Sequence, residues 1–247
     1  MTKALEGKVA LVTGGSRGIG AAIAKRLGAD GASVAFTYAS AQGKADDVVK
    51  AIEAAGGRAL AIRADSADVQ AVRDAVAETV RALGRLDVLV SSAGILTMAP
   101  LDQFSIDDFD RMVAVNIRAA FVAAQEAARH MGEGGRIINI GSVNADRMPF
   151  AGGSVYAMTK AALAGLTRGL ARDLGPRGIT VNNVQPGPVN TDMNPADGAF
   201  AESLKALMAL DRYGRAEEIA ALVAYLAGPD AGFVTGASLT IDGGFAA

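Results

Sequence analysis

The sequence lacks cysteine, has one histidine and carries almost no net charge, and each of these absences excludes a class of protein. Its 247 residues include 24 Lys and Arg against 26 Asp and Glu, a net charge of −2. A near-neutral chain has no electrostatic footprint for DNA or RNA, so we expect no nucleic-acid partner. Zero cysteines exclude disulfides, zinc–thiolate sites and a thiol nucleophile. The lone His130 cannot form a multi-histidine site, so we predict no metal centre.

Long hydrophobic runs, linkers and repeats are also missing. The longest apolar run, residues 219–227, is far shorter than the roughly 18 residues that a membrane span requires. The opening stretch, MTKALEGKVA, lacks the apolar core of a signal peptide. With no Pro/Ser-rich linker, residues 1–247 are predicted to form a single domain. We therefore expect a cytoplasmic protein with no membrane partner.

Short β-branched runs alternate with alanine-rich, helically periodic segments along the whole chain. Strands are predicted at 9–13, 33–37, 58–62, 86–90, 136–140, 179–184 and 238–241. Helices are predicted near 18–29, 41–55, 68–82, 105–130, 154–174, 200–209 and 216–227. Most strands are hydrophobic on both faces, as VALVT is, which is typical of strands covered on both sides. The pattern predicts an α/β protein with a Rossmann-type, doubly wound, parallel seven-stranded sheet in three α/β/α layers.

The glycine-rich stretch VTGGSRGIG, residues 12–20, follows the first predicted strand and opens the first helix. Gly14 suits a tight turn, Gly18 the close approach of a pyrophosphate, and Gly20 close helix–strand packing. The spacing Gly-x-x-x-Gly-x-Gly is a variant of the dinucleotide fingerprint. We predict a nucleotide site here, with a purely structural turn as the alternative.

The residues after the second predicted strand favour NADP(H) over NAD(H). Enzymes that use NAD place an acid there to bind the ribose 2′-hydroxyl, and this sequence has none between Asp30 and Asp46. Arg17, with Ser40 and Lys44, could supply charge and hydrogen bonds to a 2′-phosphate. The alternative is that Arg17 is a solvated arginine at a helix start.

Three residues suggest proton transfer at the same edge of the sheet. Ser142 directly follows the fifth predicted strand, while Tyr156 and Lys160 are i and i+4 on one face of the next helix. A tyrosine with a pKa of about 10 is a poor acid or base near neutrality, but a lysine cation one turn away favours the phenolate. A tyrosine and a lysine on an exposed helix face are the alternative.

Together these motifs resemble the short-chain dehydrogenase/reductase family, in its single-domain form, over the whole chain. The matching residues are Thr13-Gly14-x-x-x-Gly18-x-Gly20, Ser91-Ser92-Ala93-Gly94, Asn116, Ser142, Tyr156-x-x-x-Lys160 and Pro186-Gly187. The sequence looks most like the 3-oxoacyl-(acyl carrier protein) reductases and related carbonyl reductases. This implies an NADP-dependent oxidoreductase with a small-molecule carbonyl or alcohol substrate.

The resemblance implies a role for each catalytic residue. Tyr156 would donate a proton to the carbonyl oxygen as hydride arrives from the nicotinamide. Lys160 would hold the ribose hydroxyls and lower the pKa of the tyrosine, and Ser142 would hydrogen-bond the substrate oxygen. Asn116 would hold a water that links Lys160 to solvent.

The resemblance and the glycine-rich stretch together imply a larger set of cofactor contacts. Asp65 and Ser66 would lie at the adenine, although capping of the following helix is the alternative for both. Val189 and Thr191 would lie at the nicotinamide carboxamide. The complete predicted set is Gly14, Ser16, Arg17, Gly18, Ile19, Gly20, Tyr38, Ala39, Ser40, Asp65, Ser66, Ser92, Ala93, Gly94, Tyr156, Lys160, Pro186, Gly187, Val189 and Thr191.

Two departures from the family pattern affect the expected substrate. The usual Asn-Asn-Ala-Gly is Ser91-Ser92-Ala93-Gly94 here, which removes amides that brace the sheet or touch the cofactor. A basic residue that the acyl carrier protein reductases use for docking is replaced by Glu133, although Arg177 matches a second one. We therefore expect free carbonyl substrates first and carrier-linked ones second.

Residues 188–212 correspond to a mobile substrate lid in the resembled family. Met193, Leu204, Leu207 and Met208 could line an apolar pocket there, although such residues at helical spacing are more often core. The family resemblance also implies a homotetramer or homodimer.

Two other function classes stay open. The stretches 141–149 and 194–198 are similar to a branch of the family associated with a cyclic dinucleotide, so a signalling protein that binds this nucleotide is one alternative. Arg147 could bind its phosphate or be an exposed loop arginine. A structural scaffold is disfavoured, because it would not need Ser142, Tyr156 and Lys160 together.

Overall fold

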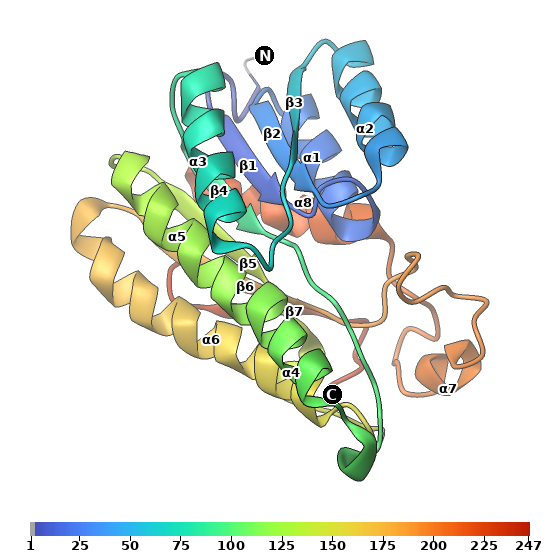
Figure 1. Cartoon of the computed structure of the whole chain (residues 1–247). Coiled ribbons are helices and arrows are strands. Elements are labelled where there is room, and N and C mark those ends of the chain that lie inside the picture. The colour runs from blue at the N-terminus through green and yellow to red at the C-terminus, as the bar shows by residue number, and fades with distance from the viewer. Residues whose placement is uncertain (1–2) are drawn as a thin grey trace.

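The seven predicted strands align in one parallel sheet (Figure 1). The computed structural model describes residues 3–247. The strands are β1 (Val9–Thr13), β2 (Ser33–Tyr38), β3 (Arg58–Arg63), β4 (Val88–Ser91), β5 (Arg136–Ile140), β6 (Thr180–Pro186) and β7 (Ser238–Ile241). Their order is β3-β2-β1-β4-β5-β6-β7. The winding reverses between β1 and β4, and doubly wound sheets bind ligands beyond the carboxyl ends of the strands at such a switch point.

Helices cover both faces of the sheet, which confirms the three-layer prediction (Figure 1). One layer contains α1 (Gly18–Ala29), α2 (Gln42–Ala54) and α8 (Ala216–Ala227). The other contains α3 (Val69–Leu83), α4 (Ile106–Val113), α5 (Ala119–His130) and α6 (Ser154–Leu174). The short helix α7 (Ala201–Lys205) stands apart from both layers, and within residues 3–247 no helix has the length and apolarity to span a bilayer.

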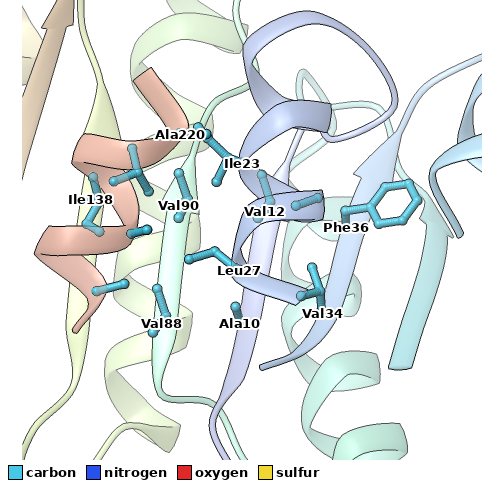
Figure 2. Close-up of a cluster of buried hydrophobic side chains, with 14 of the residues drawn as sticks. Ala10, Val12, Ile23, Leu27, Val34, Phe36, Val88, Val90, Ile138 and Ala220 are labelled. Carbon is cyan, nitrogen blue, oxygen red and sulfur yellow. The ribbon is translucent and has the colours of Figure 1, made fainter. Parts of the chain in front are cut away.

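Alternating side chains of the central strands pack into two different clusters, which explains why such strands carry hydrophobic residues on both faces. Val12 and Val90 pack with Ile23 and Leu27 of α1 in one cluster (Figure 2). Leu11, the neighbour of Val12, belongs to a second cluster on the opposite face, with residues of α3 and α5. Because both faces are buried, the strand ends are the part of the sheet that can carry a site.

Several predicted boundaries differ from the structure: β6, for example, spans Thr180–Pro186 where 179–184 was predicted. The helix predicted at 105–130 is interrupted by a π-helical turn, Ala114–Arg118, which separates α4 from α5. The helix predicted at 200–209 ends at Lys205, because the chain there closes into a turn. The strand predicted from residue 86 begins at Val88, and the Asp87 carboxylate just before it accepts a hydrogen bond from the Val9 amide at 2.9 Å.

Candidate active site

The glycine-rich stretch turns the chain from β1 into α1, and its glycines lie where larger residues do not fit. Gly14 has φ +68°, in the left-handed region, and a Cβ there would lie 2.8 Å from the Ala93 Cα. A Cβ on Gly20 would collide with the Gly14 carbonyl oxygen. The Gly14 amide donates to Thr37 Oγ1 at 3.0 Å, which fixes the turn against β2.

The start of α1 suits an anion. Arg17 is the N-cap residue, its side chain makes no capping hydrogen bond, and the first turn of this described helix holds no acid. Unpaired amides and the helix dipole favour a phosphate at such an end. Together with the glycines, this donor set fits the pyrophosphate of a dinucleotide.

Ser142 and Tyr156 meet at the carboxyl end of β5. Ser142 caps a short 3₁₀ turn, its Oγ accepting from the Asn144 amide at 3.1 Å. Burial raises the pKa of Tyr156 above its usual value, and a hydrogen bond with the Ser142 side chain only partly opposes this. The sequence led us to expect the opposite, a phenolate favoured by Lys160. The structure corrects this expectation, because loss of solvent around the phenol is the largest influence on its pKa.

Lys160 is buried beneath this pair, with 6% of its surface exposed. Its Nζ donates to the Ile140 carbonyl at 3.0 Å and lies 5.6 Å from the centre of the Tyr156 ring. Because burial disfavours the ammonium, the pKa of Lys160 falls to about 8. A Cβ on Gly94 would lie 3.5 Å from this Nζ, so the loop after β4 lies against the lysine.

Asn116 lies in the π-helical turn and fixes the loop after β4. Its side chain accepts from the Ile95 amide at 2.9 Å and donates to the Ile95 carbonyl at 3.0 Å. It also donates to Thr159 Oγ1 at 3.1 Å, and Thr159 in turn donates to the Tyr156 carbonyl. Sequence reasoning missed Thr159, although its place between Tyr156 and Lys160 was a signal. The arrangement joins Asn116 to the helix that carries the tyrosine and the lysine.

Two predicted contacts at the adenine and ribose end are engaged elsewhere in the protein. Asp65 accepts from the Ala67 amide at 2.9 Å and pairs with Arg111 at 3.0 Å, which lowers the pKa of its carboxyl. The N-cap of α3 is Asp68, so the predicted capping alternative for Asp65 is wrong. The Tyr38 hydroxyl donates to the side chain of Gln42 in α2. Ser66, by contrast, lines a small void with Thr13 and Thr37 at the strand ends.

The remaining predicted residues lie around the same edge of the sheet. The Ser92 and Ala93 amides donate to Thr13 Oγ1 at 3.0 and 3.1 Å. The Gly187 amide donates to the Ile241 carbonyl at 3.0 Å, so the turn after β6 lies against β7. Of the others, Ser16 follows β1, Ile19 lies in the first turn of α1, and Ala39 and Ser40 follow β2. Pro186 ends β6, and Val189 and Thr191 come after it.

In the described part of the chain, no other group takes over, at position 91, the hydrogen bonds that the family's asparagine would make. The Ser91 hydroxyl is buried without a hydrogen-bond partner among the described residues. Its register neighbour Asn139 donates to Thr167 Oγ1 at 2.9 Å, and Asn183 on the next strand donates to Ser238 Oγ at 3.1 Å. The bracing amides are therefore on β5 and β6.

Residues 188–212 pack against the carboxyl terminus. Met208 lies in a small core with Val143 and Phe245, and Leu204 and Leu207 pack against it. These three predicted pocket residues are thus core, whereas Met193 is half exposed. Arg147 is not an exposed loop arginine, since it donates to the Phe245 carbonyl and lies 5.6 Å from the centre of the Phe245 ring. Its guanidinium ties the loop after Ser142 to the end of the chain.

Comparison with known proteins identifies the family. A protein-family model described as Enoyl-(Acyl carrier protein) reductase matches residues 14–246. A short-chain dehydrogenase/reductase from Serratia marcescens BCRC 10948 is 63% identical, with a TM-score of 0.98 over 99% of this chain and 100% of that one. The chain belongs to the short-chain dehydrogenase/reductase family.

Two further relatives bear on the ligand. A short-chain dehydrogenase from Burkholderia cenocepacia J2315, solved in complex with NADP, is 59% identical, with a TM-score of 0.98 over 99% of this chain and 100% of that one. The Cyclic-di-GMP-binding biofilm dispersal mediator protein of Escherichia coli K12 is 54% identical over 244 residues, 99% of each chain. This chain is an NADP-dependent oxidoreductase of the family, and its glycine-rich turn fits that cofactor.

Proposed function

We propose that the protein reduces free ketones or aldehydes to alcohols with NADPH, with Tyr156 as proton donor. The observation that carries this proposal is the meeting of Ser142, Tyr156 and buried Lys160 at the sheet edge where the glycine-rich turn opens α1. The ordinary pKa of a phenol lies well above neutrality and burial raises that of Tyr156 further, so Tyr156 holds a proton at neutral pH, the one that the proposed step transfers.

The chain's own groups would share the work as follows. NADPH, when bound, supplies the hydride. The amides at the start of α1 hold the pyrophosphate, Arg17 the 2′-phosphate, and Lys160 the ribose hydroxyls. Ser142 donates a hydrogen bond to the carbonyl oxygen, and Tyr156 transfers the proton of its Oη to that oxygen. Asn116 keeps the loop after β4 against Lys160, from which the tyrosine is reprotonated. The other residues of the predicted cofactor set complete the binding surface.

The surroundings support a free and apolar substrate over a carrier-linked one. Leu96, Met98 and Phe150, in segments that follow β4 and β5, keep more than a third of their surface exposed, and so does Phe200 of the 188–212 segment. Arg177, the remaining match to a carrier-docking residue, donates to the Ala128 and Met131 carbonyls at 2.7 and 2.8 Å. Its guanidinium is occupied at the end of α5. The 188–212 segment would close over the substrate as a lid.

The test is NADPH and NADH oxidation followed by absorbance against a panel of ketones, diketones and 3-oxo esters, with a 3-oxoacyl carrier protein alongside. We expect NADPH-selective turnover of the small carbonyl compounds, abolished in Tyr156→Phe. Turnover of the carrier-linked substrate alone would replace the proposed substrate class. NADPH binding with no turnover of any substrate would contradict the reductase proposal.

A second candidate is a signalling protein that binds a cyclic dinucleotide, favoured by the identity to the Escherichia coli relative. The engagement of Arg147 with Phe245 weighs against it, because this guanidinium would have to leave the carboxyl terminus to bind a phosphate. Titration with cyclic di-GMP at saturating NADPH separates the two functions. Binding that survives the cofactor would favour signalling, and loss of binding would leave the reductase.

The assembly is proposed from family membership: a homotetramer, or a homodimer as the alternative. Small residues on α6, such as Ala161 and Gly165, would allow close packing against a second copy. Sedimentation of the purified protein tests this.

A further inference from the structure

A hollow of about 300 Å³ lies beside the glycine-rich turn, outside the edge that carries Ser142 and Tyr156. The first turn of α1, the start of α2, the start of α8 and the turn at Asp192 surround it. Its charged walls are Arg17, Lys25, Lys44, Asp47, Asp192 and Glu217. Three cations and three acids therefore face one hollow at the point where a 2′-phosphate is proposed to lie.

One ion pair crosses this hollow. Lys44 of α2 pairs with Asp192 of the 188–212 segment, a partner 148 residues further along the chain. Both side chains are half exposed, so solvent can separate them. Lys44, and more weakly Arg17, hold the pKa of the Asp192 carboxyl below its usual range. Asp192 is thus an anion paired with Lys44 and influenced by the charge of Arg17, the two cations predicted for the 2′-phosphate.

The turn that carries Asp192 connects the Lys44–Asp192 ion pair to the 188–212 segment, the proposed substrate lid. Asp192 lies at the tip of a tight turn in which Thr191 and Asn194 exchange backbone hydrogen bonds of 3.3 and 3.0 Å. The methyl group of Thr191 is 3.4 Å from where a Cβ on Gly18 would be, so the turn rests on the glycine-rich stretch. Tyr213 also holds the turn, donating to Asn194 Oδ1 at 3.2 Å.

We propose that Asp192 is a specificity-determining residue that competes with the 2′-phosphate for Lys44. Its carboxylate holds Lys44 until the phosphate takes the lysine over. Binding of NADPH, but not of NADH, then breaks the tie between α2 and the 188–212 segment. This inference rests on the proposed 2′-phosphate site at Arg17, and it does not depend on which substrate is reduced.

The expected effect is modest, because exposed ion pairs are weak and screened by salt. Asp192→Asn removes the carboxylate that competes with the phosphate for Lys44. We expect it to tighten NADPH binding by about three- to tenfold at low salt and NADH binding by less than about twofold. Lys44→Met should weaken NADPH binding by a similar factor and leave NADH unchanged.

The test is titration of cofactor fluorescence, which needs no substrate and no turnover. Four proteins are compared with both cofactors at low and high salt: wild type, Asp192→Asn, Lys44→Met and the double variant. The gain from Asp192→Asn should disappear in the Lys44→Met background. Asp47→Asn is the matched control, because Asp47 lines the same hollow without an ion pair to Lys44 among the described residues. We expect it to change NADPH affinity by less than about twofold, whether or not Lys44 is present.

Equal effects of Asp192→Asn on the two cofactors would overturn the proposal, and so would a gain that persists without Lys44. If Asp47→Asn tightened NADPH binding as much as Asp192→Asn does, the proposal would also be overturned, because the effect would then come from net charge alone. If the wild-type protein did not prefer NADPH to NADH, the proposed 2′-phosphate site at Arg17 would itself be contradicted. If the protein preferred NADPH but turned over no carbonyl compound, only the proposed reaction would be contradicted, and this inference would not be affected.

Discussion

Replacing Lys160 by methionine tests the electrostatics of the site through the stability of the cofactor-free protein. Burial lowers the pKa of Lys160 from 10.5 to about 8 in the folded chain. In the unfolded chain the amine regains a pKa of about 10.4. Between these pH values the unfolded state binds more protons than the folded state. The free energy of unfolding of the wild-type protein therefore rises with pH across this window.

The size of the rise follows from the two pKa values. Below pH 8 the amine is protonated in both states, and the cost of burying its charge is constant. Each pH unit between the folded and unfolded pKa is worth about 1.4 kcal/mol, so the full rise is about 3 kcal/mol. About 1 kcal/mol of it should appear between pH 7 and 9, and about 2–3 kcal/mol by pH 10.

Urea unfolding followed by circular dichroism, from about pH 7 to pH 10, measures this rise. The quantity of interest is the difference between wild type and Lys160→Met, because titrations of other groups cancel in it. Wild type should gain stability relative to the variant as pH increases. Lys50→Met, at an exposed lysine of α2, should run parallel to wild type. Parallel profiles for wild type and Lys160→Met would refute the burial argument.

Three further outcomes are expected. Gly20→Ala should abolish NADPH binding and lower the free energy of unfolding by at least about 1–3 kcal/mol, because its Cβ would collide with the Gly14 carbonyl; unchanged cofactor affinity would contradict this. Arg147→Met should raise KM more than it lowers kcat and speed tryptic cleavage within 188–212, since Phe245 loses its tie to the loop after Ser142. Thr159→Val should cost about 1–3 kcal/mol in urea unfolding, because the buried Asn116 amide loses a partner; an unchanged midpoint would show that Asn116 finds another.

The fold and the centre of the site could be predicted because their signals are local in sequence. Strands such as β1 carry hydrophobic residues on both faces, and the structure buries both faces of the sheet. Ser142 directly follows β5, while Tyr156 and Lys160 are one turn apart on α6. Each of these positions is set by a single helix or strand and by where that element ends. Sequence periodicity predicts such elements and their ends well.

The contacts that were missed join segments far apart in the chain. Thr159 meets Asn116 across 43 residues, Arg147 meets Phe245 across 98, and Lys44 meets Asp192 across 148. The π-helical turn at Ala114–Arg118 was hidden because its composition is that of an ordinary helix. Periodicity carries no information on such pairings, which depend on how loops at the edge of the sheet pack.

The wrong direction for the pKa of Tyr156 has the same origin. Residue spacing places a cation beside the phenol, but it does not report how deeply both groups are buried. Burial penalises whichever form is charged, so it raises the pKa of Tyr156 and lowers that of Lys160. Side chains that titrate at nearly the same pH in water therefore separate in the fold, and the lysine loses its proton first. At neutral pH the tyrosine keeps its proton and the lysine remains mostly charged. This is the protonation state that the proposed proton transfer from Tyr156 would use.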